Sequence, residues 1–285
     1  MTSALYIGLM SGTSMDGVDG VLVAFTPATS PALRVLAHSH LPFDPPLSAA
    51  MLDLNGSAAN ELHRAALAAN QLAKHYSACV EALLLNAAVD RRQIVAIGAH
   101  GQTVRHRPGE FDGTGYTIQL NAPALLAEST GIDVVCDFRS RDIAAGGQGA
   151  PLVPAFHCAM FGALAPSLAV LNVGGISNLT VLHSNQVVHG FDCGPGNALM
   201  DLWCELNTGA RFDAQGAWAR SGVAIAQLVD AMFVEPYFAR LPPKSTGRDT
   251  FNLPWLQGKL AKLKSTVAPQ DVQAPVGIAT DLAFR

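Results

Sequence analysis

The feature that most constrains this chain lies near its N-terminus, where two apolar runs flank a short polar segment rich in glycine. The runs, Leu5–Leu9 and Val18–Phe25, have the aliphatic and β-branched composition typical of strands. A short connection between two such runs predicts a β-hairpin. Glycine lets the main chain approach a ligand closely, and a concave turn directs several N–H groups at an anion. The hairpin turn is therefore a candidate phosphate site.

The turn also combines hydroxyl and carboxylate side chains, which is the mixture that a phosphate accompanied by hydrated Mg²⁺ requires. It is not a Walker loop, because the chain has no G-x-x-x-x-G-K-[ST] sequence here. An ordinary hairpin with a polar loop is the alternative interpretation. We favour a phosphate-binding turn made of the following residues: Gly12, Thr13, Ser14, Met15, Asp16, Gly17, Val18 and Asp19.

Composition limits the classes of protein to consider. At 285 residues with 49% hydrophobic side chains, the chain can form one large or two medium domains with a sizeable core. The net charge of −4, with 14% charged residues, excludes the basic surface typical of binding to nucleic acid or anionic membranes. The five cysteines form no C-x-x-C pair, which favours a reducing compartment. No signal peptide or apolar run of about 18 residues occurs, so we expect a soluble cytoplasmic protein.

The pattern along the chain predicts an α/β fold with two lobes. Strand-like runs such as Ile94–Ala99 alternate with helical patterns, of which Ser57–Asn86 is the longest and is expected to form two helices. From Ser167 the order of strand, glycine turn and strand occurs a second time. This approximate repeat predicts related lobes with a cleft between them, over residues 1–166 and 167–285.

Two short blocks of the second lobe have the composition of a functional site. The glycine turn Asn172–Asn178 can direct main-chain N–H groups at a phosphate, although a plain hairpin turn is an equal alternative. Asp192 is expected at the C-terminal end of a strand, before a helix that begins near Pro195. This would place the carboxylate over a cleft beside a helix N-terminus, and the alternative is a helix N-cap.

Further polar blocks suit recognition of a sugar or a phosphate. His100 and Gln102 follow a buried strand, where polar side chains can bind hydroxyl and amide groups, although such a histidine is more often structural. Arg139 can hold a carboxylate in bidentate fashion, or it can pair with nearby aspartates. The segment Lys244–Asn252 has the composition of a phosphate-binding loop and equally that of a solvated surface loop.

The segment Gly8–Asp19, GLMSGTSMDGVD, resembles the signature of the anhydro-N-acetylmuramic acid kinases, and the later blocks add to the resemblance. It extends from about Ala4 to about Val272. The family belongs to the sugar kinase/Hsp70/actin superfamily, so the resemblance implies a two-lobed ribonuclease H-like fold. The implied reaction is the ATP-dependent conversion of 1,6-anhydro-N-acetylmuramic acid and water to N-acetylmuramic acid 6-phosphate, a step of cell-wall recycling.

The resemblance also implies roles for individual residues. Both glycine turns would bind the phosphates of ATP, with Asn172, Gly174 and Gly175 acting in the second turn and Asp16 orienting Mg²⁺. Asp192 would be the catalytic base that activates the water. Contacts with the amino sugar would come from the following residues: His100, Gln102, Arg139 and Asn178.

The chain departs from the family pattern at its C-terminal end. After Gln273 it lacks the long helix and the glycine-rich adenine-binding turn expected of the family, and Pro275 and Gly277 oppose a helix. We therefore expect a truncated second lobe with an incomplete adenine pocket and an uncovered apolar face. Three interpretations stay open: an active kinase, an inactive remnant that binds the sugar, and a superfamily hydrolase such as a polyphosphatase. The sequence does not decide between a monomer and a homodimer.

Overall fold

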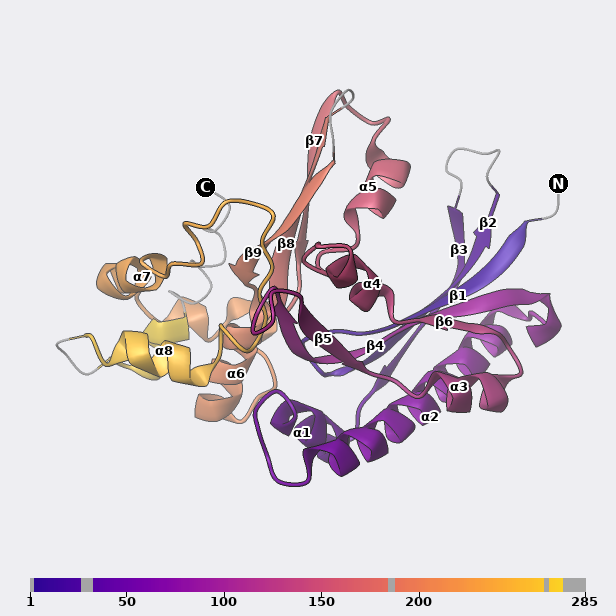
Figure 1. Ribbon diagram of the computed structural model, residues 1–285. Coiled ribbons are helices and arrows are strands. Elements are labelled where there is room, and N and C mark those ends of the chain that lie inside the picture. Colours follow the sequence, from indigo (N-terminus) through magenta and orange to yellow (C-terminus); the bar gives the residue numbers. More distant parts are fainter. Residues whose placement is uncertain (1–2, 27–32, 184–187, 264–266, 274–285) are drawn as a thin grey trace. The chain divides into compact units, whose positions relative to one another are not determined.

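The computed structural model of the chain describes residues 3–26, 33–183, 188–263 and 267–273 (Figure 1). The chain divides into two compact units, Met1–Gly149 and Ala150–Arg285. The second sheet begins at Ser167, and the compact units divide earlier, after Gly149. The predicted division into lobes at residues 166 and 167 stays a prediction.

Unit 1 contains a mixed sheet of six strands in the order β3-β2-β1-β4-β5, with β6 also paired to β4. The pairs β1–β2 and β2–β3 are antiparallel, whereas β1–β4 and β4–β6 are parallel. This arrangement agrees with the α/β class that the sequence pattern predicts and with the ribonuclease H-like fold that the family resemblance implies. The strands are β1 (Ala4–Ser11), β2 (Gly17–Phe25), β3 (Leu33–Pro42), β4 (Ile94–Pro108), β5 (Gly115–Leu120) and β6 (Val134–Cys136).

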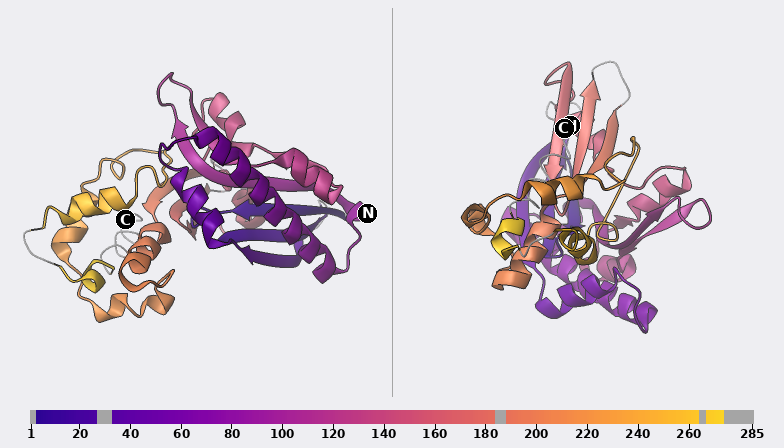
Figure 2. Two further views of the ribbon diagram at one scale, coloured as in Figure 1. Left: turned by 90° about the horizontal axis from the view of Figure 1, so that it is seen from below. Right: turned by 90° about the vertical axis from the view of Figure 1, so that its left-hand side faces the viewer.

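Helices cover both faces of this sheet, and Figure 1 shows α1, α2 and α3 on one face and α4 on the other. The helix α2 runs along the sheet (Figure 2, left) and buries an apolar stripe that includes Leu72, Tyr76 and Leu83. The prediction of two helices in this region was wrong, because the stripe continues without a breaker through 27 residues. The helices are α1 (Pro45–Asp53), α2 (Glu61–Ala87), the 3₁₀ helix η1 (Arg91–Gln93), α3 (Pro123–Thr130) and α4 (Phe138–Ala144).

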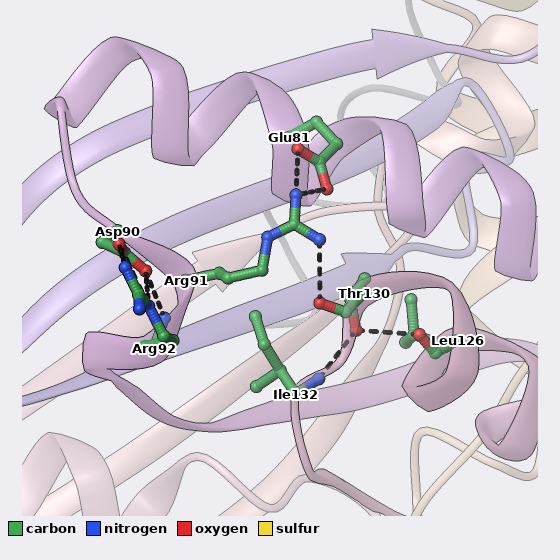
Figure 3. A network of polar contacts seen from close by, with 7 residues as sticks. All are labelled: Glu81, Asp90, Arg91, Arg92, Leu126, Thr130 and Ile132. Atoms are coloured by element: carbon green, nitrogen blue, oxygen red, sulfur yellow. Dashed lines mark hydrogen bonds and ion pairs between the residues drawn. The ribbon is translucent and has the colours of Figure 1, made fainter.

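A polar network joins α2 to the C-terminal end of α3 in unit 1 (Figure 3). Arg91 donates two hydrogen bonds from Nη2 to the Glu81 carboxylate, at 2.9 and 3.0 Å, and one from Nη1 to Thr130 O at 3.1 Å. Because a cation near a helix C-terminus interacts favourably with its free carbonyl groups, this arginine stabilises the end of α3 as well as its position beside α2.

Unit 2 is built on a smaller antiparallel sheet in the order β7-β8-β9. An apolar core that includes Leu199, Tyr237 and Phe251 packs its helices together. The strands are β7 (Ser167–Val173), β8 (Ile176–His183) and β9 (His189–Pro195). The helices are α5 (Pro154–Phe161), α6 (Asn197–Thr208), η2 (Ala214–Gly216), η3 (Ala219–Ser221), α7 (Ala226–Phe233) and α8 (Leu253–Leu260).

Some predictions fall on residues that the structure does not describe. These are the predictions made for the tail after Gln273. Within the described ranges, no helix is both long enough and apolar enough to span a membrane.

Candidate functional site

The first glycine turn forms the tip of the β1–β2 hairpin, as the sequence predicts. Met15 N donates to Gly12 O at 3.2 Å, and Met15 adopts a left-handed conformation with φ of 55°. Its side chain is 2% exposed, so it anchors the turn in the core, while Asp16 is exposed and accepts a hydrogen bond from Ser14 Oγ at 2.8 Å. The turn thus presents a hydroxyl and a carboxylate at the surface of unit 1.

Gln102 lies beneath this turn and connects it to the sheet. It sits on β4, is fully buried, and donates from Nε2 to Gly12 O at 3.1 Å. Its Oε1 accepts a hydrogen bond from the buried Ser11 hydroxyl. The sequence places Gln102 after a short strand, but β4 continues through it to Pro108. In the structure Gln102 supports the turn through its hydrogen bond to Gly12 O. Its predicted contact with the sugar stays a prediction.

The last residues of the predicted first turn belong to β2. Val18 has no exposed surface and packs in the core, so its side chain faces away from solvent. Asp19 pairs with His40 across the strands, at 3.1 Å from its Nδ1, and with His38 at 3.3 Å from its Nε2. Gly17 packs closely against β3, because a Cβ at this position would overlap Leu41 O. Nucleotide contacts of these residues stay predictions.

His100 and Arg139 lie together in unit 1, although 39 residues separate them. Arg139 Nε donates to His100 Nε2 at 2.9 Å, and Arg139 Nη1 donates to Gly149 O at 2.6 Å. Because the Arg139 nitrogen can only donate, His100 carries its hydrogen on Nδ1, which donates to Gly101 O at 2.7 Å. Burial and the nearby Arg139 charge lower the pKa of His100 to about 4, so the ring is neutral at pH 7.

The same surroundings contain a second histidine of β4. The His106 ring contacts the Thr117 hydroxyl at 3.1 Å, and burial followed by the Arg139 charge lowers its pKa to about 4. The loop after α4 is held in place beside these residues, because Asp142 Oδ2 accepts a hydrogen bond from Gly149 N at 2.7 Å. Unit 1 therefore holds one guanidinium beside two neutral imidazoles, a set that can bind an anionic group and hydroxyls.

The second glycine turn joins β7 to β8 in unit 2 and packs against the start of α6. Gly196 N donates to Gly175 O at 2.9 Å, and Asn197 N donates to Gly174 O at 2.8 Å. A Cβ on Gly196 would overlap Gly174 O, so the close approach requires glycine at this position. The carbonyl groups of the turn are thereby held by the helix, which fixes the conformation of the turn. Asn172, at the end of β7, is exposed.

Asp192 lies within β9, and it is 5% exposed. The strand continues to Pro195 and the helix begins at Asn197, so Asp192 is not the N-cap. It is paired in register with Asn178 of β8, and residues directly opposed in an antiparallel pair share a face of the sheet. Asn178 and Asp192, both predicted site residues, therefore lie side by side.

The surroundings of Asp192 include three residues that the sequence prediction did not assign. Tyr237 donates from its hydroxyl to Asp192 O at 2.8 Å, and Thr246 N donates to Asp192 Oδ2 at 3.0 Å. The Lys244 Nζ lies 4.9 Å from the centre of the Tyr237 ring, and burial lowers the pKa of this lysine. The composition of Lys244–Asn252 was a signal for this segment, but composition did not distinguish a site loop from a surface loop.

Four buried polar atoms around these elements have no hydrogen-bond partner among the described residues. They are Ser177 Oγ, Asn178 Oδ1, Asn197 Oδ1 and Thr246 Oγ1. Three of them belong to the turn-proximal end of β8 and the first residue of α6, and the fourth belongs to the segment that holds Asp192. A buried polar group without a partner costs free energy, and ligands or water normally satisfy such groups. These atoms therefore fit a polar ligand at this end of unit 2.

The residues also fit the nucleotide and metal that the sequence predicts. Main-chain hydrogen bonds fix the conformation of both turns, and a fixed concave turn is able to direct N–H groups at an anion. Mg²⁺ needs only one or two carboxylates because it keeps several waters, and the exposed Asp16 can supply one. No cluster of three or more histidine, cysteine or acidic residues suited to a metal occurs in the part of the chain that the structure describes.

Comparison with known proteins identifies the family. The family model described as anhydro-N-acetylmuramic acid kinase matches residues 4–280. The chain is 58% identical to the anhydro-N-acetylmuramic acid kinase of Albidiferax ferrireducens, over 95% of this chain and 74% of that protein. It is 55% identical to that of Cupriavidus metallidurans, over 99% of this chain and 75% of that protein. A solved PilM-PilN type IV pilus biogenesis complex matches with a TM-score of 0.43 and 13% identity, over 98% of this chain and 96% of that one.

These findings first define a class, the carbohydrate kinases. Within that class the chain belongs to the anhydro-N-acetylmuramic acid kinase family, which confirms the family resemblance of the N-terminal segment. The match reaches residue 280, beyond the end near Val272 that the sequence pattern indicated.

Proposed function

We propose that this chain converts 1,6-anhydro-N-acetylmuramic acid, ATP and water to N-acetylmuramic acid 6-phosphate and ADP. The observation that carries the proposal is the position of Asp192, a buried carboxylate with unpartnered polar atoms near it, in a chain of this family. Because the reaction consumes ATP, we place it in the cytoplasm, as a step in the recycling of cell-wall amino sugars.

Asp192 is proposed to be the general base. It removes one proton from a water whose oxygen forms a bond to the anomeric carbon C1. The bond between C1 and the bridging O6 breaks, and O6 takes the γ-phosphoryl group of ATP. The main chain of Asp192 is held by Tyr237 and its carboxylate by Thr246, so the base is positioned before the substrate arrives.

The two glycine turns are proposed to position the phosphates of ATP. Phosphoryl transfer depends mainly on orientation and on neutralisation of charge, which main-chain N–H groups of a fixed turn can supply. In the first turn, the Gly12–Asp16 segment offers main-chain groups and the Ser14 hydroxyl. In the second, Gly174 and Gly175 are held in place by α6. Mg²⁺, oriented by Asp16, would neutralise charge on the phosphates when bound.

The polar group of unit 1 is proposed to bind the sugar. The lactyl carboxylate of the substrate is an anion, and Arg139 supplies a permanent positive charge. The low pKa of His100 keeps this ring neutral at pH 7, so that it binds hydroxyl groups without adding charge. Asn178, beside Asp192, is proposed to hydrogen-bond the sugar through the unpartnered Oδ1.

The experiment that tests the proposal measures ADP release in a coupled assay with and without the anhydro sugar. We expect sugar-dependent release from the parent chain. Asp192→Asn keeps the shape and the acceptor oxygen for Thr246 N but removes the base, so turnover is expected to fall by at least about 100-fold while ATP affinity is retained. The matched control is Asp230→Asn, an exposed position on α7 that should leave turnover unchanged.

The other outcomes of this assay are distinct. Phosphate release without sugar would indicate a hydrolase, and no release would indicate a protein that at most binds the sugar. Substantial turnover by Asp192→Asn would exclude Asp192 as the base.

A further inference from the structure

A segment distant in sequence holds both the main chain and the carboxylate of Asp192. Asp192 N donates to Lys244 O at 3.1 Å, and Thr246 N, 54 residues away, donates to Asp192 Oδ2 at 3.0 Å. A hydrogen bond from a fixed N–H group to a carboxylate oxygen orients the carboxylate. The position of the carboxylate therefore depends on the segment Lys244–Thr246.

The segment is itself anchored on both sides by the aromatic core of unit 2. Tyr237 precedes it and Phe251 follows it, and their rings meet edge to face with centroids 5.7 Å apart. Both rings are buried, at 4% and 1% exposure. Because such a core resists movement, the main chain between these two residues is held in place beside β9.

Thr246 carries a second polar group, its hydroxyl, which takes no part in holding Asp192. Its Oγ1 is buried and has no hydrogen-bond partner among the described residues. Only three bonds separate Oγ1 from the nitrogen that holds Asp192 Oδ2. A hydroxyl can accept two hydrogen bonds and donate one, so this atom has unused hydrogen-bonding capacity next to the carboxylate.

We propose that Thr246 positions the attacking water, with its Oγ1 accepting the second hydrogen of the water that Asp192 deprotonates. This role rests on the proposed function. One hydrogen passes to Asp192 as the water oxygen bonds to C1 and the C1–O6 bond breaks. The other hydrogen stays on the new hydroxyl and donates to Thr246 throughout. The water oxygen becomes more positive as it attacks, so this hydrogen bond strengthens in the transition state and raises kcat.

The test compares Thr246→Val with Thr246→Ser in the sugar-dependent ADP assay. Valine keeps the shape and the N–H group and removes only the hydroxyl. We expect kcat to fall by about 10- to 100-fold with little change in KM for the sugar or ATP, and serine to restore most of it. Because valine removes a buried hydroxyl without a partner, Thr246→Val should unfold at the same temperature as the parent chain or higher.

Thr180→Val is the matched control in the same unit. The Thr180 hydroxyl is fully buried and contacts His157 Nδ1 at 2.9 Å, so its loss should lower the unfolding temperature and leave kcat unchanged. The two variants are thus expected to have opposite effects on stability and turnover.

Two results would overturn the inference, and they are distinguishable. If the parent chain shows sugar-dependent turnover and Thr246→Val keeps kcat within about twofold, or loses it together with stability and without rescue by serine, only the role of Thr246 fails. If the parent chain releases no ADP in response to the sugar, the proposed function fails and the role of Thr246 fails with it.

Discussion

Replacing Gly196 by alanine tests how tightly the second glycine turn is held by α6. The added Cβ would overlap Gly174 O and lie 2.8 Å from Ser177 Oγ. Both neighbours are constrained, because Gly174 O accepts from Asn197 N and Ser177 is 1% exposed. The turn and the helix must therefore separate to accommodate one methyl group.

The cost follows from the contacts that separation breaks. The hydrogen bonds from Gly196 N to Gly175 O and from Asn197 N to Gly174 O, 2.9 and 2.8 Å long, are lost or stretched. Each contributes about 1 kcal/mol net. Overpacking adds about 1–3 kcal/mol, and the reduced entropy of the unfolded chain returns at most about 1 kcal/mol. We expect the free energy of unfolding of unit 2 to fall by about 2–4 kcal/mol, a large part of the 5–15 kcal/mol typical of a protein.

Tryptophan fluorescence during urea unfolding measures this loss in the correct unit, because Trp203, Trp218 and Trp255, the three tryptophans of the chain, belong to unit 2. The matched control is Gly258→Ala in α8, where a Cβ meets nothing within 4 Å and alanine should stabilise by about 0.5–1 kcal/mol. A loss below about 1 kcal/mol for Gly196→Ala would refute the reasoning, since the turn would then have room to move.

Two further predictions concern unit 1. Folded His100 has a pKa of about 4 against an ordinary value of 6.5, so the unfolded chain binds the proton more readily. The contribution of His100 to stability should therefore fall as the pH drops from about 6.5 to about 4, by up to about 3 kcal/mol. An acid titration of the urea midpoint should be flatter for His100→Gln than for the parent chain. Arg139→Ala removes the proposed partner of the lactyl carboxylate, so calorimetry should show sugar binding weakened by at least about tenfold and ATP binding unchanged. Arg139→Lys keeps the positive charge but not the two-pronged geometry of the guanidinium, so its sugar affinity should be intermediate. An unchanged sugar affinity for Arg139→Ala would exclude the contact.

The sequence predicted the parts of the fold that depend on neighbouring residues. The hairpin of β1 and β2 and that of β7 and β8 follow from apolar runs around glycine turns, because strand propensity and turn geometry act over a few residues. The family also follows from a local motif, Gly8–Asp19, which a comparison over the whole chain confirmed.

Element lengths were less predictable. The strand β4 was expected to end at Ala99 but continues to Pro108, because Gln102, Thr103 and the residues after them pair with β5. Polar side chains in this part of β4 resemble a loop in sequence. Pairing with β5 stabilises these residues as a strand despite their polar composition. Local strand propensity does not include the stabilisation that comes from a partner strand.

Arrangements between distant segments had no signal in the sequence. The amide of Gln102 supports the turn at Gly12 across 90 positions, and Thr246 holds Asp192 across 54. Such contacts form because a hydrophobic core brings segments together, and here the rings around Tyr237 place a segment of ambiguous composition beside a carboxylate. Residue types and spacing indicate which groups are capable of chemistry. Long-range packing determines which of them meet, because burial depends on every element of the core at once.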